Sequence, residues 1–464
     1  MDNDRLNDFD EEERQLVIDF ENTVLQGGSQ FFDVDELEVI IDYYFEANEV
    51  DSLRQAVEYA EQLYPNSSSI RLRRGHLLIA ERRFEEARII IEKLRAEEPD
   101  NTDVAYSLGV VYGSLGESEK AIELFMEAAN DGWMPGRVYA NIAEEYYNLR
   151  DYDEAIRYYH LALDTDSYDN ATFYNYLDTC LATGHAGDAV EYLTSFVGEH
   201  PYSCVAWHCL GTAYREMGLL EKAVDAYEYA LAIDKSYVYV YGDLSAAYGA
   251  MGDLGNAVTS LRRSLDYVAK RSAVFCSIAY LYAQVENYEA TETYLRKAIE
   301  EDPSDGEPLA ALALALAKRG DIASAKPMVR KALRFSPNDP EVLCLAGLVY
   351  ELAENYEQAS DYFERMLEEE GCNESQCLRY AQYLFRIKDY DQLIDFLQES
   401  LEIYPHHPYY SSLMAAAAFY SNRYNRASRA LPDADRELLA ELCPEIIEHP
   451  RLGPLVPPEK EQPK

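Results

Sequence analysis

Small apolar side chains recur along the chain at a fixed interval. When the chain is divided into equal units that begin at residues 34, 68, 102 and so on up to 408, position 20 is alanine in nine units: Ala87, Ala121, Ala155, Ala189, Ala223, Ala257, Ala325, Ala359 and Ala427. Prolines keep the same spacing or its multiples, at Pro65, Pro99, Pro201, Pro303, Pro337 and Pro405. Each unit holds two helical patterns, so the alanine permits close helix packing and the proline ends the second helix. The pattern predicts an all-helical chain of repeated antiparallel helix pairs.

Twelve such units fill residues 34–441 without an insertion. Only residues 1–33 precede the array and only residues 442–464 follow it, and neither segment is long enough for a catalytic domain. The chain is therefore predicted to be repeat almost throughout, rather than the three or so domains that its 464 residues would otherwise suggest.

Both ends of the array are expected to carry a capping helix, because a solenoid otherwise exposes an apolar face at each terminus. The acidic segment 1–33 contains a helical pattern that ends at Gly27–Gly28. At the other end, Asp433–Leu442 has a similar pattern. Residues 442–464 are expected to hold the remnant of that cap and, over 450–464, a proline-rich disordered tail.

Residues 204–237 contain the most complete unit. They read Trp207-x2-Leu210-Gly211-x2-Tyr214, followed by Gly218, Ala223, Tyr227 and Ala230. A 34-residue period with these residues at these offsets resembles the tetratricopeptide repeat (TPR) family. The resemblance implies a right-handed superhelix, an α-solenoid of antiparallel helix pairs with capping helices. It also implies a non-catalytic role in protein binding.

The resemblance further indicates where a partner would bind. In TPR arrays, positions 2, 5, 6, 9, 12 and 13 of each first helix line a concave groove. Applied to residues 136–271, this register gives as peptide-binding candidates Arg137, Asn141, Glu144, Tyr174, Asn175, Asp178, His208, Thr212, Arg215, Tyr239 and Asp243.

Asn141 and Asn175 occupy position 6 of consecutive units and resemble the asparagine ladder with which some TPR arrays hold a peptide backbone. An amide both donates and accepts, which suits a peptide. The ladder ends at Ser107 and Cys209, so two solvated asparagines are an equally weighted interpretation. The lysine and asparagine clamp that binds chaperone tails is missing from positions 5 and 9, which disfavours that subtype.

The chain is strongly acidic, with 41 basic and 85 acidic side chains and a net charge of −44. This charge disfavours nucleic acid and anionic membranes as partners and favours a basic protein surface. Residues 1–50 are especially acidic, whereas Arg and Lys outnumber Glu within 71–95. Solvated helix faces explain this pattern most simply. The sharper hypothesis is that the acidic segment docks on the basic island, within one chain or in a homo-oligomer.

Candidate chemistry is sparse. There is no glycine-rich phosphate loop, no HExxH motif and no nucleophile elbow. His406 and His407 lie in an inter-repeat turn, and the pairs Cys204/Cys209 and Cys372/Cys377 lack further ligands at zinc-finger spacing. We therefore expect no enzyme, no cofactor and no metal site, and we interpret the cysteines as reduced thiols.

Apolar runs and the N-terminal residues bear on the location of the chain, and one proline bears on helix geometry. The longest apolar run, Leu309–Ala317, is too short to span a membrane, and the N-terminus lacks the features of a signal peptide, so a cytoplasmic location is expected. Pro327 falls inside a predicted second helix, where we expect a kink or a late helix start.

The sequence thus favours a scaffold or adaptor that binds a peptide segment or basic protein surface in its groove. One alternative is an assembly or regulatory subunit of a larger complex, which would use its edges and convex face. A second alternative is a small-molecule or glycan sensor, which would require a closed pocket around Tyr174, His208 and Tyr239.

Overall fold

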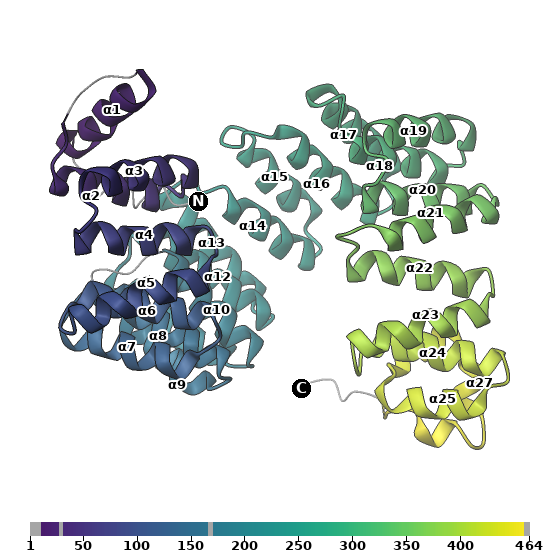
Figure 1. Cartoon of the computed structure of the whole chain (residues 1–464). Coiled ribbons are helices and arrows are strands. Elements are labelled where there is room, and N and C mark those ends of the chain that lie inside the picture. The colour runs from purple at the N-terminus through teal and green to yellow at the C-terminus, as the bar shows by residue number, and fades with distance from the viewer. Residues whose placement is uncertain (1–10, 27–30, 166–169, 459–464) are drawn as a thin grey trace. The chain divides into compact units, whose positions relative to one another are not determined.

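The computed structural model describes residues 11–26, 31–165 and 170–458, and all regular elements within them are helical (Figure 1). The chain divides into two compact units, Met1–Val240 and Tyr241–Lys464. The division falls inside α14 (Tyr239–Ala250).

The first unit stacks helices in chain order (Figure 1). They are α1 (Glu11–Gln26), α2 (Val34–Glu46), α3 (Val50–Leu63), α4 (Ser68–Ala80), α5 (Phe84–Glu97), α6 (Thr102–Ser114), α7 (Ser118–Asn130), α8 (Pro135–Asn148), α9 (Tyr152–Leu163), α10 (Asn170–Ala182), α11 (Ala186–Glu199), α12 (Cys204–Glu216) and α13 (Leu220–Ile233). The helix α1 packs on α2 and buries Val17 and Phe20 beside Phe32 and Tyr44. It covers the apolar end of the first repeat, as a cap must.

The second unit has the same internal arrangement. Its helices are α15 (Leu254–Ser264), α16 (Arg271–Gln284), α17 (Tyr288–Glu301), α18 (Gly306–Lys318), α19 (Ile322–Phe335), α20 (Pro340–Leu352), α21 (Tyr356–Glu368), α22 (Glu374–Arg386), α23 (Tyr390–Ile403), α24 (Pro408–Tyr420), α25 (Tyr424–Ala430), η2 (Leu431–Asp433), α26 (Arg436–Leu442), α27 (Pro444–Glu448) and η3 (Gly453–Leu455). From α2 to α25 the described residues form twelve consecutive helix pairs, each starting within one residue of the predicted unit start.

Close packing inside each pair explains the residues that carry the period. The position-20 alanines Ala87, Ala121 and Ala155 are fully buried. A Cβ atom added to Gly211 would lie 2.6 Å from the Tyr227 ring, so only glycine lets α13 approach α12 this closely. The spacing of small residues therefore reports direct helix contact.

The turn between the two helices of each repeat is equally regular. Its position-15 residue has a φ between 55 and 87° in all twelve repeats: Asn48, Arg82, Gly116, Arg150, Gly184, Gly218, Gly252, Glu286, Gly320, Glu354, Lys388 and Asn422. A left-handed residue directly after a helix reverses the chain and satisfies the last carbonyl groups. The amide of Leu219, for example, donates to the Tyr214 carbonyl.

The expectation of a late helix start at Pro327 is wrong, because α19 begins at Ile322 and contains Pro327. Ala325 and Val329 are buried on this helix, which packs against α18. Their burial outweighs the loss of one backbone hydrogen bond at the proline.

The expectation of a disordered tail is wrong for residues 450–458. Leu452 and Val456 are buried there, and Arg436 donates to the Pro457 carbonyl at 3.3 Å. Burial of two branched apolar side chains holds this segment against α26 and α27. Residues 459–464 lie outside the described part of the chain.

Candidate functional site

The predicted groove positions of neighbouring repeats contact one another in the first unit. The Arg73 guanidinium on α4 donates to Asp42 on α2 at 2.7 Å. On the next pair of first helices, the His76 ring lies 2.8 Å from the Ser107 hydroxyl. Asn141 on α8 then donates to the Tyr106 hydroxyl at 2.9 Å. These side chains therefore lie on one common face of α2, α4, α6 and α8.

Arg137 makes the longest-range of these contacts. Its guanidinium lies 3.2 Å from the Glu46 carboxylate, 91 residues earlier in the chain, and 5.7 Å from the centre of the Tyr106 ring. Burial lowers the pKa of Arg137, but Tyr106 and Glu46 raise it, and the net shift is upward. Because α2 opens the first repeat and α8 opens the fourth, this link across two intervening repeats indicates that the common face is concave in this unit.

His76 lies inside the same network and is held neutral. Burial, followed by the nearby charges of Arg73 and Arg137, lowers its pKa to about 3. Its ring packs beside Phe45 at 5.3 Å. On the N-terminal part of the concave face, the polar side chains of α2, α4, α6 and α8 thus bind one another.

Acidic side chains occupy the next part of this face. Glu144 on α8 and Asp178 on α10 both hold position 9 of their repeats, and both are exposed, as is Asn175. Although solvent reaches the Glu144 side chain, partial desolvation by the surrounding surface and then the adjacent Glu145 raise its pKa. Burial, then Glu144 and more weakly Asp178, also raise the pKa of Tyr159, so both carboxylates lie near one phenol. No ion pair among the described residues includes Glu144 or Asp178.

Glu145 adds a buried carboxyl group behind this surface. It is only 7% exposed, and its Oε2 atom has no hydrogen-bond partner. Position 10 is apolar in neighbouring repeats, where Leu77 and Val111 are fully buried. The sequence signal of this buried acid is a glutamate at position 10, where neighbouring repeats have apolar residues. Position 10 is not one of the groove positions, so the groove prediction did not include Glu145. Glu145 thus leaves one acceptor oxygen unsatisfied on α8.

The candidates on α12 have different surroundings. His208, predicted to face the groove, is only 6% exposed and packs between the rings of Tyr174, Tyr227 and Tyr237. Thr212 lies 3.2 Å from the Tyr227 hydroxyl. His208 is therefore a packing residue, because three aromatic rings enclose it.

The remaining candidates are Arg215, Tyr239 and Asp243. Arg215 pairs with its neighbour Glu216 at 3.1 Å. Tyr239 is 69% exposed and lies edge-on to Tyr237, whereas Asp243 belongs to the second unit.

Comparison with known families identifies the array. Tetratricopeptide repeat models match residues 72–133, 136–169, 204–237 and 282–347. The chain belongs to the tetratricopeptide repeat family. Arrays of this family are protein-interaction scaffolds, and this chain has that architecture. No curated protein matches the sequence.

Several solved structures are similar to this TPR chain at low identity. Yeast Tom70 is 13% identical, with a TM-score of 0.46, over 90% of this chain and 97% of Tom70. The Cut9–Hcn1 hetero-tetramer of APC/C is 14% identical, with a TM-score of 0.35, over 88% of this chain and 93% of the other. YrrB, described as a TPR protein with an unusual peptide-binding site, is 20% identical, with a TM-score of 0.28, over 39% of this chain and 92% of YrrB.

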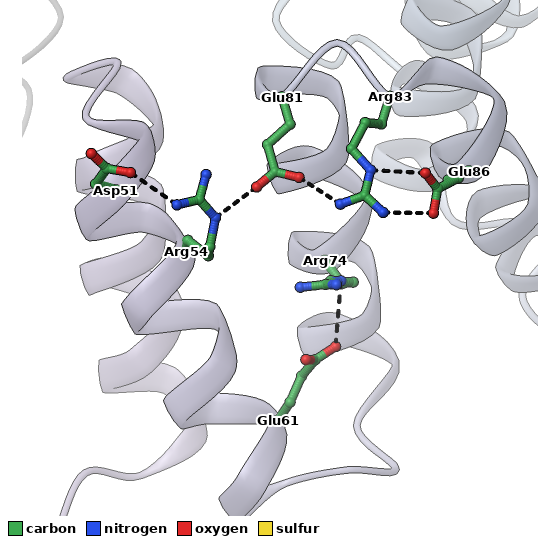
Figure 2. A network of polar contacts seen from close by, with 7 residues as sticks. All are labelled: Asp51, Arg54, Glu61, Arg74, Glu81, Arg83 and Glu86. Carbon is green, nitrogen blue, oxygen red and sulfur yellow. Dashed lines mark hydrogen bonds and ion pairs between the residues drawn. The ribbon is translucent and has the colours of Figure 1, made fainter.

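Six arginines of the basic island at 71–95 form ion pairs within the chain, and Arg54, which precedes the island, joins the same network. Figure 2 shows Arg54 between Asp51 and Glu81, and Arg83 between Glu81 and Glu86, at distances of 2.7–2.9 Å. Hydrogen bonds from Arg54 and Arg83 lower the pKa of Glu81. This network joins α3 to the turn before α5 and occupies basic side chains that an acidic partner would need.

The acidic segment 1–50 also supplies partners to the island. Arg73 contacts Glu38 at 3.2 Å as well as Asp42. Because α2 and α4 are the first helices of consecutive repeats, these contacts belong to ordinary packing between repeats, and docking of the acidic N-terminus on the island remains a hypothesis.

The described residues contain neither a metal-binding cluster nor a membrane-spanning helix. Among residues 11–26, 31–165 and 170–458, no cluster of three or more His, Cys, Asp and Glu side chains is arranged to hold a metal ion. Within the same ranges, every helix is too short or too polar to cross a bilayer.

Proposed function

We propose that this TPR array is a non-catalytic scaffold that binds a basic, extended peptide segment along the concave face of α8, α10 and α12. The observation that carries the proposal is the acidic surface of Glu144 and Asp178, backed by the buried Glu145. These carboxylates have no cationic partner among the described residues. A Lys or Arg side chain of a partner would supply it and lower the free energy of the charged carboxylates.

Amide groups support an extended peptide as the form of the ligand. Asn175 is exposed beside Asp178, and its amide can donate to a peptide carbonyl and accept from a peptide N–H. Asn141 already donates one hydrogen bond to Tyr106, which leaves its second N–H and its carbonyl oxygen for a ligand. The two rungs of the predicted ladder therefore contribute unequally, and Asn175 carries more of the recognition.

Exposed apolar residues on second helices favour the assembly-subunit alternative. Ile89 on α5 is 66% exposed, Tyr229 on α13 is 58% exposed, and Ile403 at the end of α23 is 71% exposed. They belong to different repeats, and single exposed apolar side chains are ordinary on protein surfaces. The acidic concave surface is the more specific feature, so groove binding is the leading proposal.

Panning of a random peptide library against the full chain tests the proposal. We expect enriched peptides to be rich in Lys and Arg. The double variant Glu144→Gln, Asp178→Asn should weaken an enriched peptide at least tenfold, or about 1.4 kcal/mol, in fluorescence anisotropy at low salt. The matched control is Glu123→Gln, Asp225→Asn, which removes the same charge from exposed positions on α7 and α13.

The control separates local recognition from the general field of the chain. An equal loss in both double variants would show that only the net charge matters, and would contradict a site on α8 and α10. Enrichment of neutral, apolar peptides that both variants still bind would favour the convex face and the assembly-subunit alternative.

A further inference from the structure

Two cysteines flank the first turn of α22. Asn373 caps this helix: its side chain accepts from the Gln376 amide at 3.1 Å, and the Gln376 side chain accepts from the Asn373 amide at 3.0 Å. Cys372 directly precedes the cap, and Cys377 is the fourth residue of the helix. Side chains at these two positions pack against each other when a capping box forms. The two Sγ atoms accordingly lie 3.7 Å apart.

We propose that Cys372 and Cys377 form a redox-modification site that a peroxide converts into an intramolecular disulfide. A disulfide requires an Sγ–Sγ distance of about 2.05 Å, so the sulfur atoms must approach by roughly 1.7 Å. The reciprocal capping bonds fix the backbone between the two cysteines. Both cysteines are half-buried rather than enclosed, so a small oxidant has access to them.

The chemistry balances with one peroxide molecule. The Cys377 thiolate attacks one peroxide oxygen, the O–O bond breaks, and the released hydroxide takes a proton to form water. The Cys372 sulfur then attacks the sulfenic sulfur of Cys377, the S–O bond breaks, and a second water leaves with the thiol proton. The two thiols lose two electrons and two protons in total, and the peroxide is reduced to two waters.

The surroundings assign the order of attack. Burial and the neighbouring Cys377 sulfur raise the pKa of the Cys372 thiol to about 12, so its thiolate is scarce. Cys377 lies in the first turn of α22, and we assign the first attack to it and the resolving step to Cys372.

The pair Cys204/Cys209 has the same sequence spacing and supplies an internal control. Cys204 is the first residue of α12, and its thiol donates to the Ala230 carbonyl at 3.4 Å. Cys209 is only 1% exposed. Cys204 and Cys209 have the same spacing as Cys372 and Cys377, but no capping box lies between them and Cys209 is buried. We therefore expect no disulfide between Cys204 and Cys209.

Closure of the bridge has a structural consequence. Gln376 and Arg379 on α22 both donate to Glu341 on α20, each at 2.9 Å, so the start of α22 is already attached to the preceding repeat. A disulfide from Cys372 to Cys377 would link the segment 369–373, which connects α21 to α22, covalently to the first turn of α22. Oxidation would stiffen the joint between repeats 340–373 and 374–407.

Peptide mapping of the full chain after hydrogen peroxide treatment and alkylation tests the site. We expect free thiols to fall from eight to six, with a linked peptide containing Cys372 and Cys377, lighter by two hydrogens and restored by dithiothreitol. This peptide should form faster than oxidation of any other cysteine. Amide hydrogen exchange at 369–377 should slow in the oxidised chain.

Conservative variants keep the test decisive. Cys372→Ser should abolish the bridge and leave a dimedone-reactive sulfenic acid at Cys377, with unchanged helicity. Cys377→Ser should abolish both products, whereas Cys204→Ser should alter neither. The proposal fails if the eight thiols persist, if other cysteines oxidise first, or if the bridge forms while amide exchange at 369–377 stays as fast as in the reduced chain.

Discussion

At the scale of single residues, Glu144 is an acidic side chain on the concave surface that we propose binds a basic peptide. Its carboxylate has a raised pKa because it is partly buried and lies beside Glu145. The folded state therefore disfavours the charged form relative to the unfolded state. Such a residue opposes folding at neutral pH, which is common where a side chain is retained for binding rather than stability.

The pH dependence of Glu144→Gln tests this interpretation. A raised folded pKa contributes stability below the ordinary glutamate pKa of 4.5, and that contribution is lost as the pH rises through the folded value. We expect Glu144→Gln to raise the melting temperature near pH 7 and to leave it unchanged near pH 4, where the wild-type acid is protonated. Thermal unfolding followed by circular dichroism measures both.

Glu123→Gln, on the exposed surface of α7, is the control for this measurement, since it removes one charge without the neighbouring Glu145. A melting temperature that falls near pH 7 in Glu144→Gln would show that the carboxylate stabilises the fold. That result would remove the conflict between folding and binding on which the interpretation depends.

Other residue-scale features could not be derived from the sequence. The register selects Arg137 and Asn141, but their partners Glu46 and Tyr106 depend on how tightly the first unit curves. Curvature accumulates from small rotations between repeats, which no local pattern records. The register misjudges His208 because three tyrosine rings from separate segments enclose it.

At the scale of elements, prediction succeeded because one packing rule fixes each repeat. The first helices start within one residue of the predicted frame, since the alanine and glycine positions are set by direct contact between paired helices. The predictions of a late helix start and of a disordered tail were wrong because tertiary packing outweighs the local effect of proline. Pro327 remains inside α19, and Leu452 holds a proline-rich segment against the last helices.

The left-handed turn residues give a test at this scale. Position 15 is glycine in five of the twelve repeats, whereas Glu286 has a φ of 56° and Lys388 has a φ of 65°. A side chain in this conformation costs roughly 1 kcal/mol, which glycine avoids. We expect Glu286→Gly and Lys388→Gly to stabilise α16 and α22, respectively, by up to about 1 kcal/mol, measured by native-state amide exchange in the adjoining helices.

The reverse substitution is the control. Gly218→Ala places a Cβ atom at a φ of 73° with no atom within 4 Å, so any loss of stability reports the backbone alone. Faster amide exchange in α22 after Lys388→Gly would contradict the explanation by backbone strain. It would mean that the conformational entropy that glycine loses on folding exceeds the strain that it relieves.

At the scale of the whole molecule, two electrostatic effects oppose each other. The net charge of −44 destabilises any compact state through repulsion among carboxylates. Ion pairs such as Arg54–Glu81 and Arg73–Asp42 attract helices of neighbouring repeats. Both partners of the first pair keep solvent contact, so its contribution is small, typically below about 1 kcal/mol. With 85 acidic and 41 basic side chains, repulsion should dominate.

Salt therefore should stabilise the chain. Raising sodium chloride from about 0.1 M to about 1 M shortens the screening length from about 10 Å to about 3 Å, which weakens long-range repulsion more than contacts at hydrogen-bond distance. We expect the first thermal transition to move to higher temperature, and to move further in Arg54→Gln, which has lost a salt-sensitive attraction. Because repeats unfold with nearest-neighbour cooperativity, the first transition is the one to compare. A transition that moves to lower temperature would show instead that the paired basic island outweighs the net charge in holding the repeats together.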